Sequence, residues 1–280
     1  MNRLILIEGI PGSGKTTMAT KVKTYLESCG YPVQLFLEGD LHPVDLAWMS
    51  VIPLQKFEEI RKLPLFQGCL DGNYSLEDDH AVIAYTMLDL SHEGEEWMTY
   101  FEQHEVYDQR IPFEEFQALH FARWKRFGQE ADPDTITIFE CAYLQNHISE
   151  LLRAHDRSEP EIIAYMQALI QTVKGLNPML IYLTQPSVRK TIQRVADQRR
   201  SPEPEKWKDW IDQVAEYVED SPYGKDTNAK GVDGVFQFIQ ERKDLEFKVM
   251  DQLDIEIAVI ENFDNQWKEV EDLVMACLGV

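Results

Sequence analysis

Residues 4–17 read LILIEGIPGSGKTT, and this stretch decides the fold. Residues 4–7 form an unbroken apolar run, which is typical of a buried β-strand. The loop after it spells G-x-x-x-x-G-K-T from Gly9 to Thr16, and apolar residues at helical spacing follow from Met18 onward. A strand, this loop and a helix in succession are the context that a phosphate-binding loop requires, because its glycines let successive N–H groups point at phosphate oxygens.

Individual positions of the loop have predicted roles in holding a nucleoside triphosphate. Lys15 is expected to reach the β- and γ-phosphates, and the hydroxyl of Thr16 is expected to ligate Mg²⁺. The predicted phosphate cradle consists of Gly9, Pro11, Gly12, Ser13, Gly14, Lys15, Thr16 and Thr17.

The composition excludes some partners. The 280 residues, 44% of them hydrophobic, are ample for a buried core in one large or two smaller domains. A formal net charge of −22 argues against a nucleic acid polymer as partner, because DNA and RNA bind basic surfaces. The acidic excess would instead suit a cationic small substrate.

Cysteine usage and hydropathy indicate a cytoplasmic protein. The cysteines are scattered without a C-x-x-C pair, which predicts neither a disulfide framework nor a zinc site. The N-terminal apolar run is too short for a signal peptide or a membrane span, and no other stretch qualifies. We therefore expect no association with membranes.

Strand-like and helical segments alternate along the whole chain. Further strands are expected near residues 33–37, 135–140, 179–183 and 255–260, with amphipathic helices between them. Such alternation predicts one α/β domain with a parallel sheet of about five strands and helices on both faces. Two helical insertions are expected over the carboxyl edge of the sheet, at about residues 41–130 for the substrate and about 186–250 for a lid.

Charged residues stand where parallel strands end or just after them. Glu38 and Asp40 follow the second strand and Glu140 ends the third, at the edge where ligands bind in open parallel sheets. The predicted lid helix after the fourth strand carries Arg194 and Arg199 in an otherwise acidic protein. Phosphoryl transfer needs such a set: a lysine, a metal ligand, an arginine and a carboxylate that orients the acceptor.

Together these residues resemble the P-loop kinases of the nucleoside and nucleotide kinase superfamily, which includes thymidylate kinase and the deoxynucleoside kinases; chloramphenicol phosphotransferase is a more distant relative. The resemblance implies a three-layer fold and transfer of the terminal phosphoryl group of ATP or GTP, with Mg²⁺, to a small-molecule hydroxyl. Glu38 or Asp40 would accept or orient the hydroxyl proton, Glu140 would hold Mg²⁺ directly or through water, and Arg194 and Arg199 would contact the transferring group.

Two departures leave the acceptor open. Leu41 and His42 follow Asp40 where thymidylate kinase has an Asp-Arg pair, and Cys141 follows Glu140 where deoxynucleoside kinases have an arginine. The acceptor is therefore a nucleoside, a nucleotide or a natural product such as an antibiotic. ATP or GTP as donor, Glu38 or Asp40 as base, and a monomer or a homodimer also stay open.

A second class of function competes with the kinase. A regulatory nucleotide-binding protein or a simple NTPase would use the same loop without a small-molecule acceptor, and Trp207, Trp210 and Tyr223 would then form a partner face. The arginine cluster favours the enzyme. Arg123 and Arg126 lie on an expected amphipathic helix, and we favour a solvated position for them.

Overall fold

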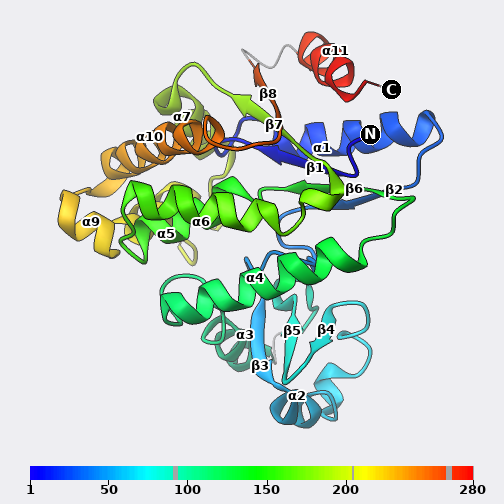
Figure 1. The fold of residues 1–280 in the computed structure, drawn as a ribbon. Coiled ribbons are helices and arrows are strands. Elements are labelled where there is room, and N and C mark those ends of the chain that lie inside the picture. Colours follow the sequence, from blue (N-terminus) through cyan, green and yellow to red (C-terminus); the bar gives the residue numbers. More distant parts are fainter. Residues whose placement is uncertain (91–93, 204, 263–266, 280) are drawn as a thin grey trace. The chain divides into compact units, whose positions relative to one another are not determined.

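The strand that precedes the glycine-rich loop lies at the centre of a five-stranded sheet in the computed structural model of the chain (Figure 1). The strand order is β2-β6-β1-β7-β8, and β1 pairs in parallel with both of its neighbours. The strands are β1 (Leu4–Glu8), β2 (Val33–Phe36), β6 (Ile136–Glu140), β7 (Pro178–Thr184) and β8 (Glu256–Glu261). The expected parallel sheet of five strands is confirmed.

The structure describes all residues except 91–93, 204, 263–266 and 280. These described residues divide into two compact units. The first comprises Met1–Leu35 with Gly128–Val280, and the second comprises Phe36–Phe127. The second unit nearly coincides with the insertion expected at about residues 41–130. No helix among the described residues is long and apolar enough to cross a membrane.

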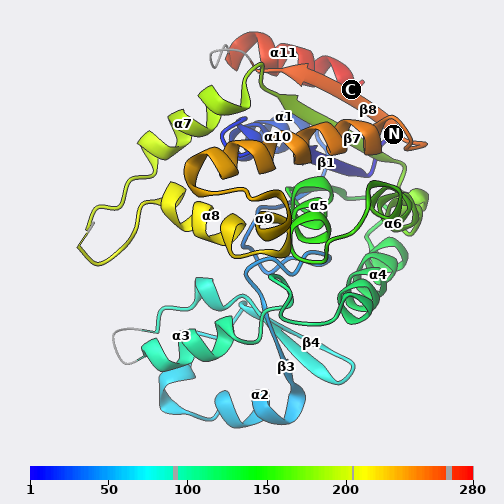
Figure 2. The ribbon, with the colours of Figure 1, turned by 90° about the vertical axis from the view of Figure 1, so that its left-hand side faces the viewer.

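Helices cover both faces of the sheet in the first unit. Figures 1 and 2 show α1 and α11 on one face, and α5, α6 and α10 on the other. The α/β fold of three layers is thus confirmed. The helices of this unit are α1 (Lys15–Ser28), α5 (Leu144–Arg153), α6 (Glu159–Gln171), α7 (Val188–Gln198), α8 (Trp210–Glu219), α9 (Pro222–Thr227), α10 (Gly231–Met250) and α11 (Trp267–Leu278), with the short 3₁₀ turn Lys174–Leu176 before β7.

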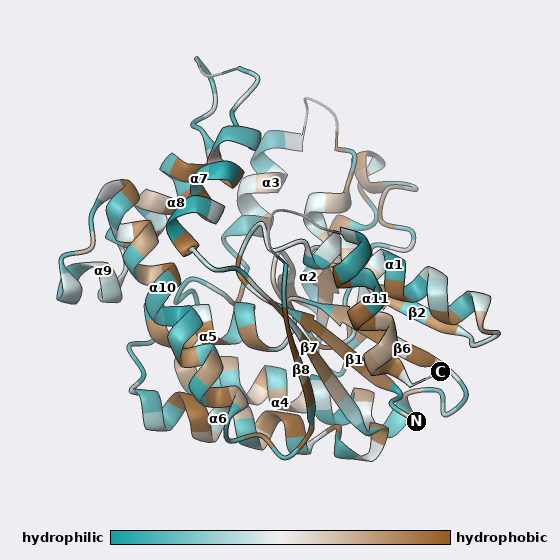
Figure 3. Cartoon of the chain, turned by 90° about the horizontal axis from the view of Figure 1, so that it is seen from above, coloured by the Kyte–Doolittle hydropathy of each residue, from teal (hydrophilic) through white to brown (hydrophobic). Residues whose placement is uncertain are grey.

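The central strands are apolar because both of their faces are covered. All five residues of β1 are buried, and β1 and β7 stand out as hydrophobic in Figure 3. The edge strand β8 is mostly half-buried or exposed and carries Glu256 and Glu261 at its ends. Charged residues on an edge strand oppose pairing with another sheet.

Sequence signals also mark where helices begin. Ser158 and Glu161 form a reciprocal capping box at the start of α6, and Pro160 lies in its first turn. The hydroxyl of Ser187 accepts a hydrogen bond from the N–H of Lys190 at the start of α7. The segment expected at about residues 186–250 contains the helices α7, α8, α9 and α10.

The second unit contains a sheet where only helices and loops were expected. Its three antiparallel strands, in the order β3-β5-β4, are β3 (Ser50–Pro53), β4 (Tyr74–Glu77) and β5 (His80–Ile83). Apolar side chains cover the sheet, with Phe57, Phe66 and Phe101 among the fully buried ones. The other elements are α2 (Leu54–Ile60), α3 (Glu95–Glu102), two short 3₁₀ turns at Pro64–Phe66 and Tyr85–Met87, and α4 (Phe113–Glu130), which ends in the first unit.

Candidate functional site

The glycine-rich loop runs from the end of β1 to the start of α1. Gly12 and Gly14 have positive φ angles of 79° and 96°, which favour glycine. A Cβ atom on Gly12 would collide with the side chain of Val195 in α7, so this position also excludes any side chain. Ile10 packs into an apolar cluster formed by α7, α8, α9 and α10, the helices of the predicted lid, and this cluster includes Val188 and Ile192. The loop is therefore held by packing as well as by hydrogen bonds.

Lys15, the first residue of α1, is almost fully buried at the end of the glycine-rich loop. Its Nζ donates to the carbonyl oxygen of Ile10 at 3.1 Å and to Oε1 of Gln145 at 3.1 Å. Both acceptors are neutral oxygens, so neither neutralises the charge of the ammonium group. A charged donor at the mouth of a backbone cradle is suited to binding a phosphate.

Thr16 and Glu140, the two predicted metal ligands, lie together. The register between β1 and β6 pairs Ile7 with Glu140, and this brings the end of β6 to the loop. The hydroxyl of Thr16 donates to Oε1 of Glu140 at 3.2 Å. A hydroxyl and a carboxylate are hard oxygen ligands, and this donor set fits Mg²⁺.

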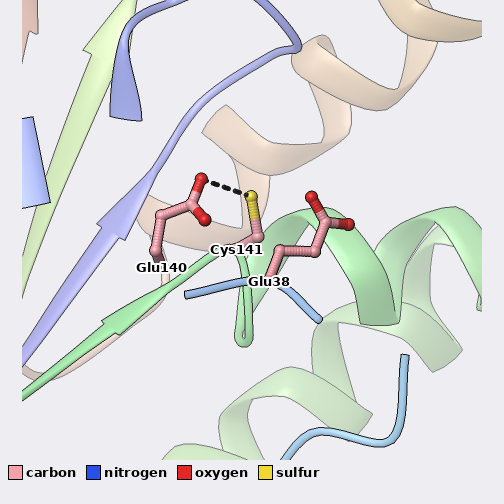
Figure 4. Close-up of side chains that lie close together, drawn as sticks. All are labelled: Glu38, Glu140 and Cys141. Atoms are coloured by element: carbon pink, nitrogen blue, oxygen red, sulfur yellow. Dashed lines mark hydrogen bonds between the residues drawn. The ribbon is translucent and has the colours of Figure 1, made fainter. Parts of the chain in front are cut away.

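Cys141 accompanies Glu140 at the end of β6 (Figure 4). Its thiol donates to Oε1 of Glu140 at 3.1 Å. The residue has a φ of 66°, in the left-handed region that non-glycine residues rarely adopt. Strained backbone of this kind clusters at functional sites.

The two lid arginines differ in what they contact. Arg194 of α7 donates from its guanidinium group to the carbonyl oxygen of Gly12 at 3.1 Å, so it lies against the loop. Arg199 follows the end of α7, and its guanidinium group lies over the ring of Trp210, 5.3 Å from the ring centre. Arg199 is therefore engaged with α8, and a contact with phosphate would require it to leave Trp210.

Glu38 and Asp40 belong to the second unit. Oδ2 of Asp40 accepts a hydrogen bond from the N–H of Leu37 at 2.8 Å, which closes the turn after β2. The side chain of Glu38 is exposed. The catalytic role of both residues stays a prediction.

The aromatic partner face of the competing function is only partly present. Trp207 is 66% exposed, but Tyr223 is buried and its hydroxyl donates to Glu241 at 2.6 Å. Trp210 packs against the apolar cluster of the lid helices. The expectation of an exposed Tyr223 is wrong, because this residue lies in the short helix α9 and its ring packs into the same apolar cluster.

Three residues around the loop were not predicted from the sequence. Glu8 is fully buried and accepts hydrogen bonds from the N–H groups of Tyr143 and Gln145. The side chain of Asn262, also fully buried, donates to the carbonyl oxygen of Ser13 at 2.8 Å. A glutamate at the end of a buried strand was a visible signal, whereas Gln145 and Asn262 have none that identifies them.

Burial raises the pKa of Glu8 to about 7, although the N–H groups of Gln145 and Tyr143 oppose this effect. Glu246 of α10 adds a smaller contribution in the same direction as burial. This residue is itself paired with Arg242 at 3.0 Å and accepts a hydrogen bond from Tyr182 at 2.5 Å. Glu8 is therefore an acid that is half-ionised near neutral pH.

Comparison with known proteins finds distant structural similarity. No protein-family model matches the chain. It is similar in fold to the thymidylate kinase of Candida albicans, at 14% identity and a TM-score of 0.43, over 99% of this chain and 91% of that one. It is also similar to the YorR protein of Bacillus subtilis in complex with phosphorylated GDP, at 13% identity and a TM-score of 0.42, over 99% of this chain and 95% of that one. The function is argued below from the residues around the loop.

Proposed function

We propose that the protein transfers the terminal phosphoryl group of ATP or GTP to a hydroxyl of a small molecule. The observation that carries the proposal is the meeting of three predicted parts at one loop. Lys15 is buried beside the loop and donates to the carbonyl oxygen of Ile10. The hydroxyl of Thr16 donates to the carboxylate of Glu140, and the guanidinium group of Arg194 donates to the carbonyl oxygen of Gly12. Transfer of a phosphoryl group depends mainly on placing such charges around it.

Each part has a separate task in the proposed reaction. Lys15 and Arg194 stabilise the negative charge that spreads over the oxygens of the transferring group. Thr16 and Glu140 would hold Mg²⁺, which would neutralise part of the charge of the phosphate groups. A regulatory protein that only binds nucleotide has little need of the arginine.

The acceptor oxygen forms a new bond to the γ-phosphorus, while the bond from that phosphorus to the oxygen bridging the β-phosphate breaks. The nucleoside diphosphate leaves with the electron pair, and the hydroxyl proton passes to a carboxylate. Either Glu38 or Asp40 is this carboxylate in the proposed reaction, and Asp40 also closes its turn through Leu37.

The direct test is product formation. The protein is incubated with Mg²⁺ and either ATP or GTP, together with nucleosides, nucleotides and aminoglycoside-like cations, and phosphorylated products are sought by mass spectrometry. We expect one acceptor class to gain a phosphoryl group. Lys15→Ala should reduce that yield by about a thousandfold or more, because the variant loses a charge that acts on the transition state.

Lys23→Ala is the matched control, since Lys23 lies on the same helix α1 but pairs only loosely with Glu27 at 3.9 Å. Its yield should equal that of the unmodified protein. Release of inorganic phosphate without any phosphorylated acceptor would contradict the transferase and favour the NTPase. An unchanged yield with Lys15→Ala would contradict any role of the loop.

A further inference from the structure

The end of β1 and the start of α5 are joined by one buried carboxylate. Oε1 of Glu8 accepts the N–H of Tyr143 at 2.8 Å, and Oε2 accepts the N–H of Gln145 at 3.1 Å. The two bonds fix the first turn of α5 against the strand that carries the glycine-rich loop. Because these bonds use backbone N–H groups, they survive substitution of the Gln145 side chain.

The Gln145 side chain points from this fixed turn to the loop lysine. Its Oε1 accepts from Nζ of Lys15 at 3.1 Å, and its Nε2 donates to Oδ1 of Asn146 at 3.5 Å. The residue is 8% exposed and Lys15 is 6% exposed, so the contact is sheltered from water. A long lysine side chain has many rotamers, and ordering it costs conformational entropy when a phosphate binds. Gln145 reduces this cost, because it holds Lys15 in one rotamer before the phosphate arrives.

The chemical identity of Gln145 matters as much as its position. An amide oxygen orients the ammonium group and leaves its charge available for a phosphate. A carboxylate at the same place would form an ion pair and compete with the phosphate for Lys15. Neutral glutamine therefore orients the ammonium group of Lys15 without itself neutralising the charge.

We propose that Gln145 is a positioning residue that holds the ammonium group of Lys15 ready for the terminal phosphates of the nucleotide, and that Glu8 sets the place of Gln145. The proposal rests on the proposed function, because it assigns a role within the same phosphate site. It concerns the binding of nucleotide before any acceptor is present.

The test measures the affinity of the full chain for a non-hydrolysable ATP analogue by calorimetry, with and without Mg²⁺. Gln145→Glu should weaken binding about tenfold or more, because the introduced carboxylate competes with the phosphates for Lys15. The affinity of the same variant for adenosine, which carries no phosphate, should change less than twofold, a selectivity that a purely structural defect does not produce. Gln171→Glu adds the same charge at an exposed position of α6 and should change the affinity less than twofold.

Gln145→Ala provides a second measurement, with an expected loss of about threefold to tenfold. Glu8→Gln should also weaken binding, and its effect should shrink in the Gln145→Ala background, because both changes act through one lysine. Equal affinity for Gln145→Glu and the unmodified protein, an equal loss of affinity for adenosine, or an equal loss with Gln171→Glu would each overturn the proposal.

The proposal and the proposed function fail in different ways. If no acceptor is ever phosphorylated, the affinity measurements still decide the role of Gln145. If Lys15→Ala binds the analogue as well as the unmodified protein does, the phosphate site itself is misassigned.

Discussion

Glu8 of the first unit and Glu77 of the second are both buried, but their pKa values are shifted in opposite directions. In the first unit, Glu8 is held by backbone N–H groups, and burial raises its pKa to about 7. In the second unit, burial would also raise the pKa of Glu77. His80, whose Nε2 lies 3.7 Å from Oε2 of Glu77, and the guanidinium groups of Arg123 and Arg126 outweigh this effect and hold the pKa well below its ordinary value.

The difference lies in the donors that surround these two carboxylates. The second unit places Arg123 in its interior, where the guanidinium group also donates to the carbonyl oxygen of His42 at 2.5 Å. The first unit holds Glu8 with neutral donors, so Lys15 and Arg194 remain at the loop for an anionic ligand. Glu8 can thus be buried near the predicted phosphate site without pairing with its cations, because backbone amides stabilise the carboxylate in place of arginines.

The largest effect is expected from Arg123→Met, which leaves Glu77 buried with only the half-exposed Arg126 as an arginine partner. Removing one partner of a buried ion pair lowers the free energy of unfolding by about 3 to 5 kcal/mol, because the other charge stays buried without compensation. Hydrogen exchange of the full chain should show faster exchange in peptides from Phe36–Phe127. Peptides from β1 and α1 should be unchanged, because the two units have separate cores.

Arg61→Met is the control for that experiment. Arg61 forms an exposed pair with Glu58 at 3.0 Å, so its loss should change exchange little. Equal acceleration of exchange in β1 and in the second unit would contradict the separation of their stabilities.

The second prediction concerns pH and Glu8. The unfolded chain releases the proton of this residue near pH 4.5 and the folded chain near pH 7, so between these values the folded state binds more protons. The free energy of unfolding must therefore fall as the pH rises, by about 3 kcal/mol across the interval from this group alone. Below pH 4.5 and above pH 7 the group contributes no slope.

Glu8→Gln should remove that slope. Urea unfolding at several pH values, followed by pulsed hydrogen exchange in β1 and α5, measures the difference between the unmodified protein and the variant, and groups that titrate in both cancel. Glu77 acts in the opposite direction, because its low pKa makes its contribution to stability disappear as the pH falls below about 4.5. A constant difference between pH 4 and pH 8 would show that Glu8 titrates normally.

A third, smaller difference is expected between glycines of the two units. Gly12 and Gly72 both have a φ of 79°, but a Cβ on Gly12 meets Val195 whereas a Cβ on Gly72 meets nothing within 4 Å. Gly72→Ala should cost about 1 to 2 kcal/mol of stability through backbone strain alone. Gly12→Ala should cost about 2 to 3 kcal/mol, because overpacking adds to the strain.

The combination with Val195→Ala separates the two contributions to the Gly12 effect. The double variant should regain the part due to the collision and keep the part due to φ, as measured by thermal unfolding. If Gly12→Ala and Gly72→Ala cost the same, α7 does not press on the loop.

The contrast between the units also explains what the sequence could predict. The loop and its flanking strand are contiguous, so residues 4–17 contain every residue of the predicted phosphate cradle. The strands β3, β4 and β5 have only four residues each, too few to display an alternating pattern. The β4–β5 hairpin turns at Asp78 and Asp79, which lack the glycine that usually signals such a turn.

Contacts between distant segments explain the remaining omissions. Gln145 meets Lys15 across 130 positions, and Asn262 meets Ser13 across 249. Arg123 was expected in solvent, yet it is 3% exposed and paired with Glu77. Helical spacing placed it on a face of α4, but only the strand β4 determines that this face is covered.

The smallest effect on stability and on nucleotide affinity should come from Arg189→Ala. This variant tests whether the arginines of α7 act through their individual contacts or only through their total charge. Arg189 pairs with Asp233 at 2.9 Å and lies over the ring of Phe236, 4.3 Å from its centre, but both charged side chains are largely exposed. Exposed pairs contribute less than about 1 kcal/mol, because water screens them. Thermal unfolding should therefore shift little, and the affinity for the ATP analogue should be unchanged, whereas Arg194→Ala on the same helix should reduce that affinity about tenfold. Equal losses of affinity in the two variants would mean that α7 acts through its total positive charge, and the contact between Arg194 and Gly12 would then have no special role in the site.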